Sequence, residues 1–240
     1  MKLTPFRTTL RNGASVLIRE VTPDDRHLLE IGFAHLSVRA RYFRFLGSRE
    51  NLTEKELDTF TATNGPDQIA VGALLRDGPT PEPIGIARYI RLPDQQHIAE
   101  IAITIVDHYQ HQGLGGLFLD VLAKFARSGG ITEFNALVHS ENTAMLQLLG
   151  QFGAVRSAFD GKDVEFAFPV SAIFVQGPGR SADIHETSDG AARKITPQAS
   201  AKLRRFVNFH PELAEINAPD QPTSVWENEG GAIIPNVHRT

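Results

Sequence analysis

Two patterns of apolar and polar residues run along the chain, one with a period of two and one with helical spacing. The first is typical of strands, which we expect over residues 15–20, 68–76, 83–92, 98–106, 133–139, 155–159 and 162–168. The second predicts helices over residues 22–35, 37–45, 53–62, 114–128 and 142–152. This order predicts an α/β fold of the α+β type, with a mixed, mostly antiparallel sheet of about six to seven strands and helices on both faces.

The pattern weakens from residue 169 onward. Glycine, proline and serine interrupt this part of the chain, and only residues 197–209 keep helical spacing. We therefore expect one functional domain over residues 14–170 and a partly flexible C-terminal extension over residues 171–240.

Composition excludes several classes of function. A net charge of -4 without a basic block disfavours nucleic acid as a partner. The absence of cysteine excludes disulfides, thiolate zinc sites and a cysteine nucleophile, and the scattered histidines predict no metal site. No apolar run approaches the roughly 20 residues that span a bilayer, and no signal peptide precedes the first strand. We expect a cytoplasmic protein without a membrane partner, and its oligomeric state, monomer or dimer, stays open.

The most informative stretch is residues 106–117, where a strand pattern changes into a glycine-rich turn and then a helix. A helix start presents backbone N–H groups without partners and the positive end of the helix dipole, so it can hold an anion. Gly113, Gly115 and Gly116 would let a phosphate approach the backbone closely. The turn therefore predicts a phosphorylated cofactor, and a plain strand-to-helix connection is the structural alternative.

Two common phosphate-binding turns do not fit this stretch. The dinucleotide fingerprint requires Gly or Ala where Phe118 stands, and the preceding strands are antiparallel in pattern. The P-loop requires a lysine followed by Ser or Thr, but Leu117 and Phe118 follow the glycines here. An acyl-CoA pyrophosphate turn is the third possibility.

Residues 110–115, Gln-His-Gln-Gly-Leu-Gly, match the Gln/Arg-x-x-Gly-x-Gly/Ala signature of the GNAT superfamily of acyl-CoA-dependent N-acyltransferases. A second segment, Asn142 to Gly153, lies where this family has its other conserved segment, and the resemblance covers residues 14–170. More narrowly, residues 41–45, 87–89 and 99–102 resemble the bacterial protein lysine acetyltransferase branch.

The resemblance implies acetyl-CoA as the cosubstrate and an amine, protein or small molecule, as the acceptor. It implies that backbone N–H groups hold the pyrophosphate, from residues His111, Gln112, Gly113, Leu114, Gly115 and Gly116. The strand end at Thr104, Ile105 and Val106 would pair with the pantetheine arm. Asn142 would contact the cofactor, cap its helix, or do both.

Glu100 is the candidate general base, the role of its counterpart in the lysine acetyltransferase branch. A lysine with its ordinary pKa of about 10.4 is protonated at neutral pH and must lose a proton before it attacks a thioester. Strand alternation places Glu100 on one face with Ala102 and Thr104, unless a bulge shifts the parity. The alternative is an exposed strand residue without a catalytic role.

The family's usual general acid, a tyrosine seven residues after the conserved Asn, is replaced by Leu149. Solvent, His139, His108 or Tyr109 could protonate the departing thiolate. Helix 37–45 presents either an aromatic face to the core with its arginines in solvent, or a surface that faces a substrate or a partner. Three functions are therefore open: transfer of an acetyl group to an amine such as a protein lysine, transfer of an acetyl group to a small-molecule amine, and acyl-CoA binding without catalysis.

Overall fold

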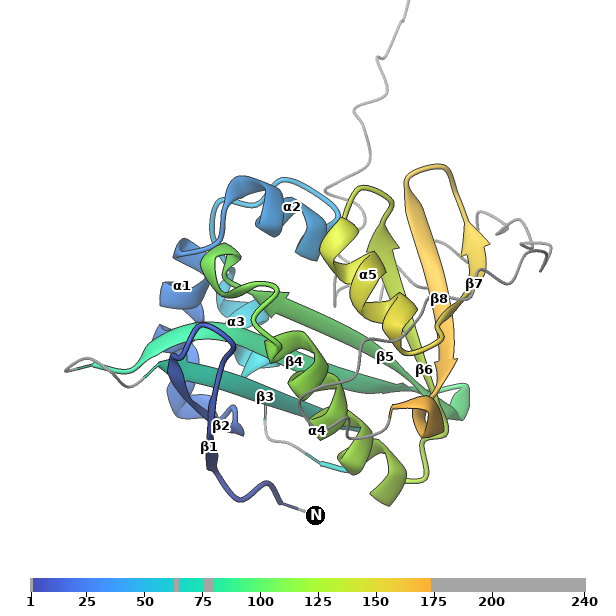
Figure 1. Ribbon diagram of the computed structural model, residues 1–240, viewed down its shortest axis with the longest axis horizontal. Helices are drawn as coiled ribbons and strands as arrows, with labels where there is room; N and C mark the ends of the chain where they lie inside the picture. The colour runs from blue at the N-terminus through green and yellow to red at the C-terminus, as the bar shows by residue number, and fades with distance from the viewer. Residues whose placement is uncertain (1, 63–64, 76–79, 174–240) are drawn as a thin grey trace, which may run out of the picture.

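The computed structural model describes residues 2–62, 65–75 and 80–173, so the extension expected from residue 171 and the helix expected over residues 197–209 lie almost wholly outside the described residues. Eight strands form one sheet in the order β1-β2-β3-β4-β5-β6-β8-β7 (Figure 1). Their bounds are β1 Phe6–Thr9, β2 Ser15–Glu20, β3 Gln68–Leu75, β4 Glu82–Leu92, β5 Gln95–Ile105, β6 Glu133–His139, β7 Val155–Phe159 and β8 Asp163–Pro169. The helices are α1 Arg26–Ala34, α2 Val38–Phe45, α3 Glu54–Phe60, α4 Leu114–Ser128 and α5 Thr143–Gln151, with 3-10 turns η1 Pro23–Asp25, η2 Asp107–Tyr109 and η3 Val170–Ala172.

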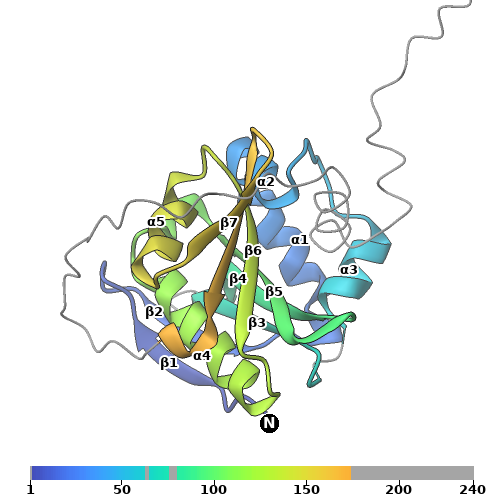
Figure 2. The same cartoon turned by 90° about the vertical axis from the view of Figure 1, so that its right-hand side faces the viewer.

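Helices cover both faces of the sheet, as the sequence predicts (Figures 1 and 2). Helix α4 is buried against one face through a continuous apolar side that includes Phe118 and Leu122, and α5 lies beside it. Helices α1, α2 and α3 meet on the other face around Phe33, Phe45 and Phe60. Among the described residues, no helix is both long and apolar enough to cross a membrane.

The predicted helices begin where local capping chemistry places them. The Ser37 hydroxyl accepts a hydrogen bond from Ala40 N at the start of α2. Thr53 and Glu56 form the predicted capping box of α3. These caps depend on residues three apart in the chain, and for that reason they could be read from the sequence.

The sheet has eight strands, so the expected count of six to seven is too low. The additional strand is β1, which forms a hairpin with β2 through the Asn12-Gly13 turn. Only four residues long, β1 alternates half-buried and exposed side chains over too few positions to stand out in the sequence. Its pairing with β2 defines it as a strand.

The only parallel pair in the described sheet joins β5 to β6 through three positions, from Ile98–Glu133 to Glu100–Asn135. Beyond the Glu100–Asn135 pair the two strands separate, while β5 continues to pair with β4 as far as Ile105. We call this separation the β5–β6 fork. It leaves one edge of β5 without a strand partner over residues 101–105, and backbone groups on that edge are available to another molecule.

The first turn of α4 lies against α5 where Gly115 meets Leu148. A Cβ atom added to Gly115 would lie 2.9 Å from Leu148 Cδ2, closer than a normal van der Waals contact. The absence of a side chain at Gly115 therefore lets the two helices approach each other. By contrast, a Cβ added to Gly150 in α5 would have no atom within 4 Å.

We predict opposite effects on stability for substitutions at these two glycines. Gly115→Val should lower the free energy of unfolding by about 1–3 kcal/mol, because it overpacks the α4–α5 contact. Gly150→Ala should raise it by about 0.5 kcal/mol, because alanine restricts the unfolded chain and fits the helix. Urea unfolding followed by circular dichroism measures both, and equal stability of the two variants would contradict the assigned contact.

Candidate active site

The open edge of β5 presents main-chain groups to the fork. Val106 N donates to Ile84 O on the β4 side, so the main-chain groups of Ile105 and Ile103 point away from β4. The Ile105 carbonyl accepts a hydrogen bond from Gln110 Nε2 at 3.1 Å. The N–H and C=O of Ile103 and the N–H of Ile105 therefore face the fork, on the segment where the sequence predicts pairing with the pantetheine arm.

Directly after β5, the chain forms the predicted turn at the start of α4. His111 and Gly113 both have positive φ, 59° and 92°, and Gly113 is the N-cap residue of α4. Backbone N–H groups of the first helical turn, from Leu114 to Gly116, have no partner within the helix because they precede its first hydrogen bond, from Leu117 N to Gly113 O. The turn combines these free donors with the positive end of a helix dipole, which suits a phosphate group.

The β1–β2 hairpin braces this turn from outside. Arg11 N donates to Gln112 O at 3.1 Å, and Arg11 Nη1 lies 3.5 Å from His111 O. These contacts link residues about 100 positions apart in the chain. They hold the two carbonyl groups on the hairpin side of the turn.

Residues of the second conserved segment serve the structure of α5. Asn142 is the N-cap, and its side chain accepts a hydrogen bond from Met145 N at 3.2 Å. Leu149, which replaces the family's tyrosine, is fully buried in the core. The capping role of Asn142 is confirmed, while its contact with the cofactor stays a prediction.

Glu100 lies at the last paired position before the fork, on the face covered by α1, α2 and α3. The β4–β5 register is unbroken from Ile105 to Ala99, so no bulge changes the parity and Glu100 shares its face with Ala102 and Thr104. Only 6% of Glu100 is exposed. The alternative of an exposed strand residue is therefore wrong.

Burial dominates the electrostatics of Glu100. Its Oε2 atom has no hydrogen-bond partner among the described residues. Loss of solvent raises the pKa of this carboxyl to about 8, while the positive charge of Arg44, and to a lesser extent that of Arg88, lowers it. A carboxyl group with a pKa in this range can accept a proton near neutral pH.

The two arginines come from elements far apart in the chain. Arg44 extends from α2 over the rings of Phe45 and Phe60. Arg88 on β4 also lies over the ring of Phe60. Burial and the nearby Arg44 lower the pKa of Arg88 to about 9. One of our two interpretations of residues 37–45 placed their arginines in solvent. The inward position of Arg44 shows that this is wrong for Arg44.

His139 ends β6, close to α2. Its ring stacks on Phe43 with centroids 5.3 Å apart and meets Tyr42 edge-on. Nδ1 accepts a hydrogen bond from Glu141 N, so the neutral ring carries its proton on Nε2. Among the proposed proton donors, His139 is buried, whereas His108 in η2 is exposed.

Sequence reasoning missed the side chains around Glu100. Arg44 entered as one of the arginines of helix 37–45 and in the family resemblance, Arg88 only in the resemblance, and Asn135 did not enter at all. Asn135 is the register partner of Glu100, 9% exposed, with Oδ1 lacking a hydrogen-bond partner within the described part of the chain. A polar residue inside an apolar strand was the one available signal for Asn135. The same part of the chain holds no cluster of three or more potential metal ligands.

The sequence matches the family described as "Acetyltransferase (GNAT) domain" over residues 15–155, more than half of its length. The chain belongs to the GNAT acetyltransferase family. The family's cosubstrate is acetyl-CoA, and its chemistry is N-acetyl transfer.

Individual relatives agree with this assignment. Acetyltransferase PA5475 of Pseudomonas aeruginosa is 30% identical over 147 residues, 61% of this chain and 78% of that protein. Acetyltransferase Pat of Mycolicibacterium smegmatis is 29% identical over 153 residues, 64% of this chain but 45% of that longer protein. The crystal structure of the GNAT domain of S. lividans PAT superposes with a TM-score of 0.63 at 26% identity, covering 69% of this chain and 96% of that domain.

The raised pKa of Glu100 predicts how stability depends on pH. Between pH 4.5 and about 8 the unfolded chain has lost the Glu100 proton while the folded chain retains it, so this group lowers stability as pH rises. The free energy of unfolding of the wild type should therefore fall relative to that of Glu100→Gln from pH 5 to pH 8. Above pH 8 the difference between the two proteins should stay constant. Urea unfolding of both proteins at pH 5, 6.5, 8 and 9 measures the difference. A constant difference would show that Glu100 titrates normally.

Proposed function

We propose that the chain transfers an acetyl group from acetyl-CoA to the Nε of a protein lysine, by direct attack of the amine in a ternary complex, with Glu100 as general base. The observation that carries the proposal is the buried carboxyl group of Glu100 at the fork, with an oxygen that no described residue bonds. The resemblance to the bacterial protein lysine acetyltransferase branch and the relatives named Pat support the choice of acceptor.

The donor side of the site suits acetyl-CoA, which supplies the activated acyl group. Free main-chain groups at Ile103 and Ile105 are suited to the amide groups of pantetheine, in the manner of an added strand. The N–H groups from residue 111 to 116 are suited to the pyrophosphate. In this arrangement the reacting thioester lies near the closed end of the fork, where Glu100 stands.

The acceptor amine reaches the site protonated, since the ordinary pKa of lysine is about 10.4. Glu100, with its pKa near 8, takes this proton directly or through one water. Arg44 and Arg88 disfavour a further cation nearby, so they assist the loss of the proton from the incoming ammonium. The neutral amine then attacks the thioester carbonyl and forms the new C–N bond. The nitrogen loses its second proton to solvent, the C–S bond breaks, and the CoA thiolate departs.

Protonation of the thiolate does not require Leu149, whose side chain is apolar and buried. His139 carries a proton on Nε2 at the end of β6, the other strand of the fork. We propose His139 or solvent as the donor, in place of the tyrosine common in the family.

The surroundings of Glu100 argue against polyamines as acceptors. A deep acidic pocket would favour a small cationic substrate, but the pocket on this face is apolar and contains Arg44 and Arg88. The second alternative, acyl-CoA binding without catalysis, predicts cofactor binding without release of thiol. We place the reaction in the cytoplasm, as the composition predicts.

For the donor site, we predict that Gly113→Ala weakens acetyl-CoA binding at least fivefold. Alanine is strained at the positive φ of 92°, so the turn must shift and its N–H groups lose their alignment. Gly130→Ala is the matched control, because Gly130 has a φ of 76° beyond the other end of α4 and a Cβ there would meet no atom within 4 Å. Calorimetric titration with acetyl-CoA compares the two. Equal weakening would mean that backbone strain alone, wherever it occurs, lowers the affinity.

For the acceptor site, we predict that Glu100→Gln lowers kcat at pH 7 by 10²–10⁴-fold with a lysine peptide, the range expected for a lost general base. The defect should shrink as pH rises and the free amine becomes abundant. Release of CoA thiol and peptide mass measure the reaction, with spermidine as the competing acceptor. Glu133→Gln, a carboxyl at the first β5–β6 pair, is the control and should keep wild-type activity.

Three outcomes would contradict the proposal in different places. Wild-type activity of Glu100→Gln would remove Glu100 as the base. Faster acetylation of spermidine than of the peptide would favour the small-molecule alternative. Tight binding of acetyl-CoA without thiol release for any amine would favour the non-catalytic module.

A further inference from the structure

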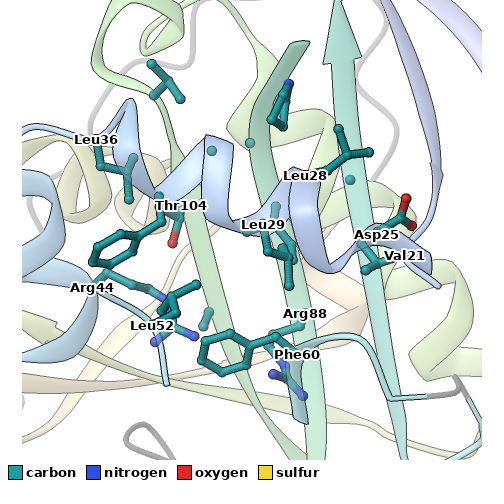
Figure 3. Close-up of a pocket in the computed structure, with 18 of the residues that line it drawn as sticks. Val21, Asp25, Leu28, Leu29, Leu36, Arg44, Leu52, Phe60, Arg88 and Thr104 are labelled. Carbon is teal, nitrogen blue, oxygen red and sulfur yellow. The ribbon is translucent and has the colours of Figure 1, made fainter. Parts of the chain in front are cut away.

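A cavity lies between α1 and the sheet, on the face that carries Glu100 (Figure 3). The empty space in and in front of it, open solvent included, is about 850 Å³. Its middle is apolar, with Leu28, Leu29, Leu52 and Phe60 among the side chains that line it. The cavity borders β5 at Ala102, Thr104 and Val106.

The end of the cavity near β2 is electrically balanced. Arg19 forms two hydrogen bonds of 2.6 Å with Asp25, and Asp25 also accepts from Thr22 N. Figure 3 shows Asp25 and Val21 at this end. The charges here are already satisfied, so this end offers little to a polar ligand.

The opposite end of the cavity, with Arg44 and Thr104, has hydrogen-bond donors without partners (Figure 3). Arg44 Nη1 and Thr104 Oγ1 are both buried and have no hydrogen-bond partner among the described residues. Both groups can donate a hydrogen bond, and the Arg88 side chain lines the same cavity. Two unfilled donors at one end of an apolar cavity are complementary to an acceptor group on an apolar body.

The Arg44 guanidinium at this end is held mainly by aromatic rings. The rings of Phe45 and Phe60 attract it but accept no conventional hydrogen bond from it. Glu56, whose charge acts on Arg44, is already engaged by Arg49 at 3.3 Å and by the cap of α3. An anion would give Arg44 Nη1 the acceptor that it lacks among the described residues.

We propose that this cavity binds an amphipathic monocarboxylate, with its carboxylate between Arg44 and Thr104 and its apolar tail beneath α1. A carboxylate provides two acceptor oxygens for a guanidinium and a hydroxyl. An amine head group would add a cation beside Arg44, and an alcohol would bring no negative charge to it. No residue of the α4 turn lines this cavity, and its occupancy can be tested without acetyl transfer.

Calorimetry on the full chain with three probes of equal tail length tests the proposal. We expect octanoate to bind at least tenfold more tightly than octanol, and octylamine to bind more weakly than either. Octanoate binding that is absent, or no tighter than that of octanol, would overturn the proposal.

Variants locate the site. Arg44→Met removes the guanidinium group and leaves an unbranched apolar side chain. It should weaken octanoate binding at least tenfold, with less than a twofold effect on octanol binding. Arg39→Met is the matched control on the same helix, since Arg39 lies over Phe43 and does not line the cavity. Thr104→Val should weaken octanoate severalfold, and Leu29→Trp should block all three probes by filling the cavity. Wild-type octanoate affinity in both Arg44→Met and Thr104→Val would place the binding elsewhere.

Discussion

The short parallel pairing between β5 and β6 is the constraint on which the rest of the site depends. Three paired positions hold the strands together at one end, and the Glu100–Asn135 pair is the last of them. The pairing of β5 with β4 continues past this point, so β5 stays in the sheet and keeps an open edge beyond Glu100. A longer β5–β6 ladder would fill that edge with β6 and leave no main-chain groups there for a bound cofactor.

Burial gives the carboxyl of Glu100 its chemistry and also creates an electrostatic cost. The loss of solvent raises its pKa, which makes it a stronger base, while Arg44 and Arg88 limit the rise. The arginines in turn are buried, and the pKa of Arg88 is lowered as a result. The three side chains therefore form one coupled system, in which a change at any member alters proton affinity at the others.

Features that depend on neighbours in the chain could be predicted from the sequence. The capping box at Thr53, the glycine turn before α4 and the parity of β5 are of this kind, and the family resemblance supplied the roles. The side chains that surround Glu100 could not be predicted, because Arg44, Arg88 and Asn135 come from three separate elements that only the folded chain brings together. Strand β1 could not be predicted, because an alternation of apolar and polar residues over only four positions is too short to indicate a strand. Its pairing with β2 defines it.

The hairpin formed by β1 and β2 has a practical consequence for any isolated version of the domain. The family match begins at residue 15, yet Arg11 bonds the carbonyl of Gln112 in the turn that precedes α4. A fragment trimmed to the family's own limits would keep every residue of the recognisable signature. It would nevertheless lack the brace that holds the signature's backbone in place, so fragment boundaries chosen by similarity alone would change the donor site they were meant to preserve.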